Sequence, residues 1–572
     1  MLEIKTFPQD MSVFEVNPKN LRECLVSGLF KETVNADGKE RVFYTYLTPG
    51  LTYNQSCLIV APPDDVPVEE YLENSFWLEF ARKEKIFIHF LKPEGRWNPD
   101  GSDADYMNKV YVQVQSRKYY VTMQDNIYAA GIGAGAQIAQ QAAMKMTSEW
   151  SGLVTFGDLG EEALLNAEAT QKSENMGKVE LSISAAKTQL PVWMFWSANE
   201  GCNQRVCDYW KKQNNSAAQR FSNQDADEIY FPVPVRKTSE INEEKISQVR
   251  VTNGFSGQVT ETAFGPVWRF LTMARRHRCH GMKALRGYKD PAACGASLHT
   301  LEVQGFTRLW YEYVPERVKA EGKPVPLVVN LHGRGGSAES FMDMSSMNCV
   351  AEERGFIVLF PEAGIHQQRP GGLRNILLWN GFYKEEKIDD VDFILKMIED
   401  VKQRYTIDET RIYACGQSSG GMMTSELALR APQVFAAAAP WSAIKDPDHD
   451  VPLPEAIQPE VPYFFLFGEN DWLCVDREKG ELEYHVAPDI AAFLRNLMEL
   501  YGLEKEPKRY TCGEISYYVY LNKKKVPMLT VGTVKEMSHA NYPWESFITY
   551  DQFFARFSKK DGKLLYMGED AV

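Results

Sequence analysis

Short apolar runs recur along the chain and alternate with stretches whose apolar residues return every three or four positions. The runs CLIVA at 57–61, FIVLF at 356–360 and YFFLF at 463–467 are examples. Continuous apolar runs of this length are typical of strands buried on both faces of a parallel sheet, and the intervening pattern is typical of helices. We therefore predict an α/β fold, in which a mostly parallel sheet is flanked by helices.

The order of these segments is repeated within the chain. Five segments of the first half have counterparts in the second: 41–50 and 307–316, 57–63 and 327–333, 85–94 and 355–362, 128–135 and 413–420, 190–200 and 461–471. Five matches in one order indicate an internal duplication. We predict two α/β domains, at 1–280 and 281–572. A helix is expected around 268–278, a linker at 280–299 and a strand from near Leu301.

Composition and charge exclude several classes of protein. Of 572 residues, 44% are hydrophobic and 24% are charged, which excludes a disordered chain, a collagen and a coiled coil. The net charge of −14 argues against a nucleic-acid partner, because the one Lys-rich block is 523–525. Apolar runs stay below about 18 residues, so we expect no membrane span. A signal-peptide pattern is not visible at residues 1–16, so we expect a cytoplasmic protein with free thiols.

A candidate nucleophile lies between a predicted strand at 411–415 and a predicted helix. Gly416, Ser418 and Gly420 fit the pattern G-x-S-x-G. In that context the pattern predicts a sharp strand-to-helix turn that exposes the serine hydroxyl. The helix N-terminus adds free N–H groups near a developing oxyanion.

The serine requires a base and a group that orients the base. In α/β hydrolases the chain order is Ser, then Asp or Glu, then His. Asp471 ends the apolar run at 463–467, and His539 follows another predicted strand. His449 precedes Asp471 and so breaks the order, while His485 lies in a charged stretch. We predict a triad of Ser418, Asp471 and His539.

Two backbone N–H groups are expected to form the oxyanion hole. One belongs to Ser419, the residue after the nucleophile, and the other to Arg334 in the glycine-rich loop after the strand at 327–331. His332 and Gly333 of the same loop are expected near the substrate. The Arg334 side chain is expected to face solvent.

Aromatic residues gather in sequence around these positions. Trp379, Asn380, Trp441 and Trp472 are candidate substrate contacts, since aromatic walls suit an aryl or flat acyl group. Core packing stays open as the alternative for each tryptophan. The Pro- and Asp-rich stretch 441–460 is a candidate lid.

A metal or cofactor is not expected at this site. The acidic residues Asp389, Asp390 and Asp392 are interpreted as the N-cap and first turn of a helix rather than as metal ligands.

Several of these segments resemble the polyhydroxybutyrate depolymerase-like esterases, the α/β-hydrolase group that includes feruloyl and acetylxylan esterases. The matching segments, between about 327 and 544, are VVNLHGRGGSAESF, FIVLFPEAG, LLWNGF, the stretch ending in YACGQSSGGMMT, FLFGENDW and SHANYPW. The resemblance implies serine esterase activity on short acyl, feruloyl or hydroxyalkanoate esters. Many members are secreted and hold disulfides near the site, whereas Cys349, Cys415 and Cys474 follow no evident pairing pattern.

The first half lacks this catalytic set. Gly133 occupies the position of Ser418, Pro62 and Pro63 replace the His-Gly pair, and 262–268 contains no histidine, although Glu200 replaces the acid. We predict a degenerate, non-catalytic α/β-hydrolase-like domain that serves packing, oligomerisation or the shape of the active-site mouth.

A rival interpretation of the first half is a dinucleotide site. Residues 131–136 also fit G-x-G-x-x-G/A, with Asp158 after the next strand. The duplication accounts for the same glycines without a cofactor.

We therefore expect a serine carboxylesterase acting on a small-molecule or oligomeric ester, without nucleic acid, membrane, metal or cofactor. Self-association into a homo-oligomer stays open. The alternatives are a serine peptidase of the same fold, because the triad also cleaves amides, and a non-catalytic binding scaffold. A serine-reactive probe separates the scaffold from either enzyme.

Overall fold

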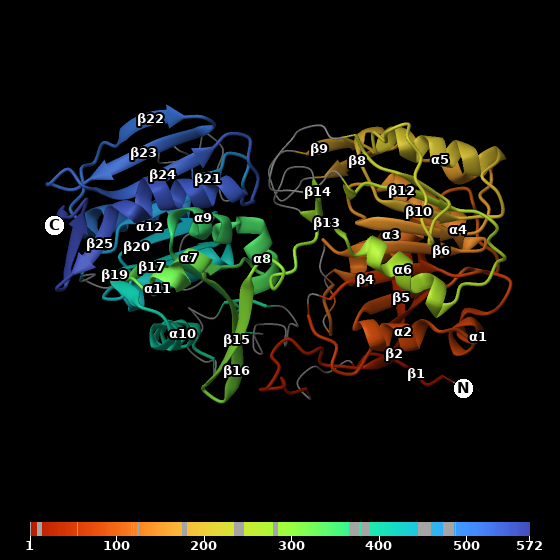
Figure 1. Ribbon diagram of the computed structural model, residues 1–572, viewed down its shortest axis with the longest axis horizontal. Helices are drawn as coiled ribbons and strands as arrows, with labels where there is room; N and C mark the ends of the chain where they lie inside the picture. The colour runs from red at the N-terminus through yellow and green to blue at the C-terminus, as the bar shows by residue number, and fades with distance from the viewer. Residues whose placement is uncertain are drawn as a thin grey trace.

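The computed structural model shows two α/β halves joined by a small hairpin (Figure 1). It describes residues 2–8, 14–53, 55–115, 117, 119–122, 125–173, 180–233, 245–277, 284–364, 377–379, 388–443, 459–472, 486 and 488–572. Within these residues no helix is long and apolar enough to cross a membrane.

The first half is built on a ten-stranded sheet with the order β1-β2-β3-β5-β4-β6-β7-β10-β12-β11. These strands are β1 Ile4–Lys5, β2 Gly28–Ala36, β3 Lys39–Leu47, β4 Cys57–Ala61, β5 Phe87–Leu91, β6 Ile127–Ile132, β7 Gly152–Phe156, β10 Val192–Phe195, β11 Glu228–Tyr230 and β12 Val249–Thr252. A separate pair consists of β8 Thr170–Ser173 and β9 Leu181–Ser184. The helices are α1 Val68–Glu73, α2 Trp77–Glu84, α3 Ser102–Val114, α4 Gly135–Lys145, α5 Gly201–Gln213 and α6 Glu261–Leu271.

The second half has a ten-stranded sheet with the order β15-β16-β18-β17-β19-β20-β21-β24-β23-β22. These strands are β15 Ala296–Val303, β16 Phe306–Tyr313, β17 Val325–Leu331, β18 Ile357–Pro361, β19 Ile407–Gln417, β20 Ala437–Trp441, β21 Tyr463–Gly468, β22 Lys508–Cys512, β23 Ile515–Leu521 and β24 Pro527–Val534. A small sheet near the C-terminus contains β25 Phe557–Lys560, β26 Lys563–Tyr566 and β27 Glu569–Asp570. The helices are α7 Glu316–Glu321, α8 Ala338–Ser345, α9 Met347–Arg354, α10 Asp390–Arg404, α11 Ser419–Arg430, α12 Pro488–Leu500 and α13 Pro543–Ile548.

The two large sheets share one central topology. Each contains an antiparallel pair, β2–β3 or β15–β16, whose second strand pairs antiparallel with the next strand in the sheet. In the first sheet, β1 lies outside this pair and is parallel to β2. Six parallel strands follow in each half, ordered β5-β4-β6-β7-β10-β12 and β18-β17-β19-β20-β21-β24. The antiparallel strand β11 then ends the first sheet, whereas two antiparallel strands, β23 and β22, end the second. The predicted α/β class, with two sheets of one kind, is confirmed.

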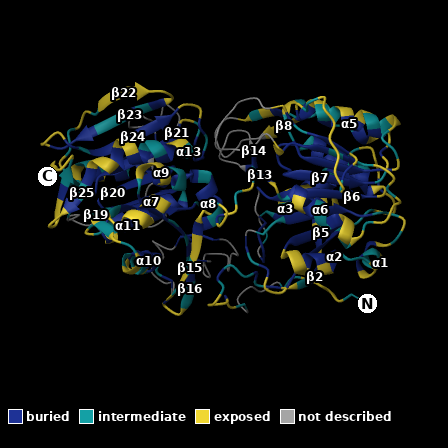
Figure 2. Ribbon diagram, in the orientation of Figure 1, coloured by how far each residue is buried: buried dark blue, intermediate teal, exposed yellow. Residues whose placement is uncertain are grey.

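Burial on both faces explains why the strands read as continuous apolar runs. In β4, Cys57 and Ile59 pack in the core with residues of α3 and α4. Leu58 and Val60 of the same strand pack on the opposite face with residues of α1, α2 and α6. Successive side chains of a strand point to opposite faces, so both must be apolar. Figure 2 shows the buried strands inside each half and exposed residues on the outer helices.

The connection between the halves differs from the predicted helix and linker. The helix α6 ends at Leu271, and β13 (Ala274–His277) pairs antiparallel with β14 (Ala284–Gly287). This hairpin contains residues from both sides of the predicted boundary at 280/281, and β15 begins at Ala296 rather than near Leu301.

Two adjacent arginines of the hairpin explain its position between the halves in Figure 1. The Arg276 side chain is buried and donates to the carbonyl oxygens of Trp150 (2.8 Å) and Thr147 (2.9 Å) in the first half. Arg275 lies 3.1 Å from the Glu339 carboxylate on α8 of the second half. Neighbouring side chains of a strand point in opposite directions, so β13 binds both halves at once.

Candidate active site

Ser418 lies at a strained turn between β19 and α11. Its backbone has φ +54° and ψ −121°, and its N–H donates to Trp441 O at 2.9 Å. A Cβ atom at Gly420 would lie 2.1 Å from Leu331 O, and one at Gly416 would lie 2.6 Å from Gly420 O. Both positions must therefore be glycine for the helix to pass so close to the sheet.

Asp471 and His539 meet at the same edge of the sheet. They follow β21 and β24, which are adjacent parallel strands, so their loops emerge side by side. His539 Nδ1 lies 2.9 Å from Asp471 Oδ2 and 3.1 Å from Oδ1, and both side chains are buried. This contact assigns the proton of a neutral imidazole to Nδ1 and leaves Nε2 as the basic nitrogen.

The expected hydrogen bond between His539 and Ser418 is not formed. His539 Nε2 is buried and has no hydrogen-bond partner among the described residues. Catalytic hydrogen bonds are often longer without a substrate and shorten in the Michaelis complex. The structure thus forms one of the two expected hydrogen bonds and leaves Nε2 without a partner in the described part of the chain.

The glycine-rich loop after β17 lies against the turn at Ser418. A Cβ atom on Gly333 would lie 3.4 Å from Ser418 Cβ and 2.4 Å from Gln417 Oε1. Ser419 is the first residue of α11, where the helix geometry provides no intrahelical partner for its N–H. The Arg334 side chain is exposed, as expected.

His332 fixes the conformation of this loop from inside the protein. Its side chain is fully buried, and burial lowers its pKa to about 4, so the ring is neutral. Nε2 accepts the Ala363 N–H at 3.1 Å, which leaves Nδ1–H to donate to Gly333 O at 2.7 Å. Because both nitrogens are engaged within the protein, His332 supports the loop rather than contacting substrate as expected.

The three candidate tryptophans occupy different environments. Trp379 is 3% exposed, and its indole N–H donates to His332 O at 2.7 Å. Trp441 is fully buried and donates to Thr549 Oγ1 at 3.1 Å. Because both side chains are buried, they pack in the core and do not form a wall of a substrate pocket. Trp472 is 54% exposed and stacks on His539, with ring centroids 4.5 Å apart.

Some sequence predictions fall outside the described residues. They are Asn380, most of the predicted lid at 441–460, His449, Cys474 and His485. The acidic stretch before α10 behaves as predicted, because Asp389 is the N-cap and accepts the Val391 N–H at 3.0 Å. Among the described residues there is no cluster of three or more metal-ligating side chains.

The sequence reasoning missed a buried carboxyl that holds the His539 loop. Glu545 accepts the Tyr542 N–H at 2.6 Å and the Asn541 side-chain N–H at 2.7 Å. Burial raises the pKa of Glu545 to about 8. The sequence did contain a signal, since Pro543 at the first helical position followed by Glu at the third is typical of a capped helix start.

The first half repeats this turn with Gly133 in place of the serine. Gly133 has φ +57°, and its N–H donates to Phe156 O at 2.7 Å, as Ser418 does to Trp441 O. A Cβ atom at Gly135 would lie 2.1 Å from Ala61 O, which matches the approach at Gly420. The tight turn thus accounts for glycines of the G-x-G-x-x-G/A pattern. Asp158, the acidic residue of that rival, instead accepts the Ser197 N–H at 2.9 Å.

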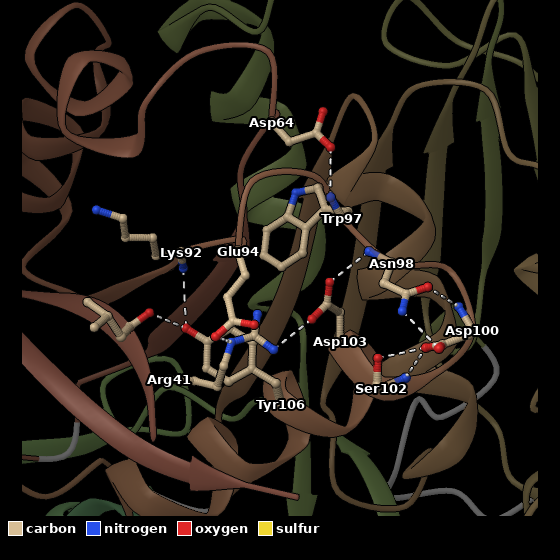
Figure 3. A network of polar contacts seen from close by, with 11 residues as sticks. Arg41, Asp64, Lys92, Glu94, Trp97, Asn98, Asp100, Ser102, Asp103 and Tyr106 are labelled. Carbon is tan, nitrogen blue, oxygen red and sulfur yellow. Dashed lines mark hydrogen bonds and ion pairs between the residues drawn. The ribbon is translucent and has the colours of Figure 1, made fainter. Parts of the chain in front are cut away.

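The loop after β5 covers the corresponding position in the first half. The Trp97 indole N–H donates to Pro62 O at 2.7 Å, which parallels the bond from Trp379 to His332 O. Asp64 accepts the Trp97 backbone N–H at 2.8 Å, and Asp103 pairs with Arg41 at 2.8 Å (Figure 3). A tryptophan therefore occupies this position in both halves, including the one whose turn carries Gly133 instead of serine, which indicates a structural role.

A known family model matches part of the second half and ends partway through the site. The family model Esterase PHB depolymerase matches residues 310–448, a stretch that includes Ser418 but neither Asp471 nor His539. Feruloyl esterase B of Thermothelomyces thermophilus is 33% identical over 135 residues, covering 23% of this chain and 43% of that protein. Acetylxylan esterase of Coprinopsis cinerea is 32% identical over 135 residues, covering 23% and 34%.

The matched stretch spans less than half the length of these curated relatives. A solved structure, acetyl xylan esterase from Aspergillus awamori, covers 45% of this chain and 99% of its own, at 16% identity and a TM-score of 0.32. Within the second half, residues 310–448 match the Esterase PHB depolymerase model, and this half, with its α/β fold, is similar in sequence to the feruloyl esterases.

Proposed function

We propose that the second half is a serine carboxylesterase that uses Ser418, His539 and Asp471. The observation that carries the proposal is the buried Asp471–His539 pair, which leaves Nε2 as the basic nitrogen at the sheet edge that also bears Ser418. Chain order and strand-end placement of all three residues support it.

In the proposed reaction, Ser418 Oγ attacks the ester carbonyl while His539 Nε2 accepts its proton. Asp471 holds the imidazole through Nδ1–H and stabilises the imidazolium that forms. The tetrahedral oxyanion accepts hydrogen bonds from the backbone N–H groups of Ser419 and Arg334. The intermediate collapses, and the alcohol leaves with the proton from Nε2. Nε2 then deprotonates a water molecule, which attacks the acyl-enzyme. The bond to Ser418 Oγ breaks, Nε2 returns the proton to that oxygen, and the acid is released.

The substrate class proposed is a carboxylic ester with a short acyl, feruloyl or hydroxyalkanoate group. Trp472 supports a flat acyl group, because its half-exposed ring lies directly against His539. The similarity to feruloyl and acetylxylan esterases supports esters over the amides that a peptidase cleaves.

The test combines labelling with hydrolysis. The full chain is treated with a fluorophosphonate probe and assayed on p-nitrophenyl acetate, methyl ferulate, acetylated xylan, a soluble polyester and a p-nitroanilide. Ser418→Ala should abolish both labelling and hydrolysis, and His539→Ala should nearly do so. Ser425→Ala is the matched control, because that hydroxyl lies buried further along α11 without a hydrogen-bond partner among the described residues.

Each outcome points to one hypothesis. Labelling of the wild type but not of Ser418→Ala, together with ester hydrolysis, supports the esterase. Preferential cleavage of the anilide would favour the peptidase. Absence of labelling would favour the binding scaffold, and wild-type rates in Ser418→Ala would refute the nucleophile.

A further inference from the structure

Two short segments of the first half reach into the loops of the proposed active site. Arg22 precedes β2 and Tyr53 follows β3, and the antiparallel pairing of β2 with β3 brings these ends together. The Tyr53 N–H donates to Arg22 O at 2.7 Å, and the Cys24 N–H donates to Leu51 O at 2.8 Å. We name Arg22 and Tyr53 the brace.

Tyr53 contacts the glycine-rich loop directly. Its side chain is 1% exposed and packs in the core of the second half with Leu331 and Trp379. Its hydroxyl donates to Gly335 O at 2.7 Å. Burial raises the pKa of Tyr53 above its usual value, so the hydroxyl keeps its proton. Gly335 directly follows Arg334, whose N–H is the proposed second oxyanion donor.

Arg22 acts on the same loop indirectly, through Glu362. Its Nε lies 3.0 Å from the carboxylate of Glu362, which is 3% exposed. Burial raises the pKa of Glu362, and the Arg22 guanidinium opposes that rise. The other carboxylate oxygen accepts the Ala338 N–H at 3.2 Å. The next residue, Ala363, donates its N–H to His332, so Arg22 supports the residue that anchors the start of the loop.

We propose that the brace of the first half positions the oxyanion loop 332–336 of the second half. Tyr53 is a positioning residue, since it acts through the Gly335 carbonyl. The inference rests on the proposed esterase function and gives the half without a catalytic set a defined part in the reaction. Within the brace, Tyr53 makes the direct contact with the loop.

The expected effect follows from what an oxyanion donor contributes. Loss of one donor lowers kcat by roughly 10²- to 10³-fold. Tyr53→Phe keeps the aromatic ring but removes the hydroxyl that binds the Gly335 carbonyl. The Arg334 N–H is still present, so this oxyanion donor is displaced rather than lost. We expect kcat on p-nitrophenyl acetate to fall about 10-fold with KM within about 2-fold, because ground-state binding uses the oxyanion contact less.

The Ki of a transition-state analogue separates positioning of the oxyanion loop from a merely structural role, which would leave that Ki unchanged. A trifluoromethyl ketone forms an oxyanion with the serine, so its Ki should rise in Tyr53→Phe by the same factor by which kcat/KM falls. Inhibition by acetate, the product, should stay unchanged. Tyr111→Phe is the matched control, because Tyr111 is also buried and donates to a carbonyl, Glu149 O, at 3.1 Å within the first half.

A second pair of variants tests Arg22 in case Tyr53→Phe folds poorly. Arg22→Lys keeps a cation near Glu362, whereas Arg22→Met removes it, so kcat should fall further in Arg22→Met than in Arg22→Lys. Equal rates in both variants would count against the brace.

The outcomes separate the brace from the esterase function. Wild-type kcat and Ki in Tyr53→Phe, or the same loss in Tyr111→Phe, would overturn the brace while leaving the esterase intact. Full activity in Ser418→Ala would instead overturn the esterase function.

Discussion

The backbone strain at Ser418 predicts how substitutions there change stability. A non-glycine residue at φ +54° and ψ −121° costs about 1–3 kcal/mol, because its Cβ crowds the neighbouring carbonyls. The first half has Gly133 at the equivalent turn, at φ +57°. The serine is thus held in a conformation that glycine adopts freely.

The net effect of Ser418→Gly is a difference of two terms. Removing the Cβ relieves about 1–3 kcal/mol of strain. The greater freedom of glycine in the unfolded chain costs about 0.5–1 kcal/mol. Ser418→Gly should therefore be about 1 kcal/mol more stable than Ser418→Ala, which keeps the Cβ. At 2–4 °C per kcal/mol for a domain of about this size, the Tm should rise by roughly 2–4 °C.

Urea unfolding followed by circular dichroism measures this difference in the free energy of unfolding. The two Ser418 variants form a matched pair, because both lack the hydroxyl of the proposed nucleophile. The reciprocal variant Gly133→Ala should lose about 1–2 kcal/mol, because its Cβ would enter the strained region and lie 3.3 Å from Pro63 Cβ. If Ser418→Gly were no more stable than Ser418→Ala, the turn would not be strained and the reasoning would fail.

Three further predictions concern the surroundings of the site. Asp471→Asn should lower kcat about 10³- to 10⁴-fold, since control of the imidazole tautomer is lost. Its residual rate of p-nitrophenyl acetate hydrolysis should still be higher than that of Ser418→Ala. The pKa of Glu545 is raised to about 8, so the stability it contributes is complete below about pH 4.5 and is lost as the pH rises through 8. Glu545→Gln should therefore flatten the fall in urea midpoint between about pH 5 and 8, and an unchanged slope would contradict this. Trp379→Phe and Trp97→Phe should each lose about 1–2 kcal/mol of unfolding free energy, because each leaves a buried carbonyl unpaired. Only Trp379→Phe should also lower kcat, because its hydrogen bond supports the loop beside Ser418. Equal losses of kcat in the two variants would refute the placement of the active site in the second half.

The sequence by itself determined the order of the segments and the chemistry at their ends. Apolar runs located β4, β18 and β21, because a strand buried on both faces must be apolar at every position. The glycines around Ser418 predicted the turn, since a strand can pass into a helix at that angle only where Cβ atoms are absent. Chain order then selected Asp471 and His539. These features are local, so each can be predicted from a few consecutive residues.

Tertiary structure alone decided which aromatic residues are buried. Trp379 and Trp472 look alike in the sequence, yet one is 3% and the other 54% exposed. Exposure depends on which distant elements cover a side chain, and the local pattern does not record that.

The strand with Arg275 and Arg276 differs from the predicted helix, because its pairing partner β14 is a separate segment and its two anchors lie in different halves. The contact of Tyr53 with Gly335 joins residues 282 positions apart. Such contacts form only when complete domains pack, so they follow from the arrangement of the two sheets and not from any single stretch of sequence.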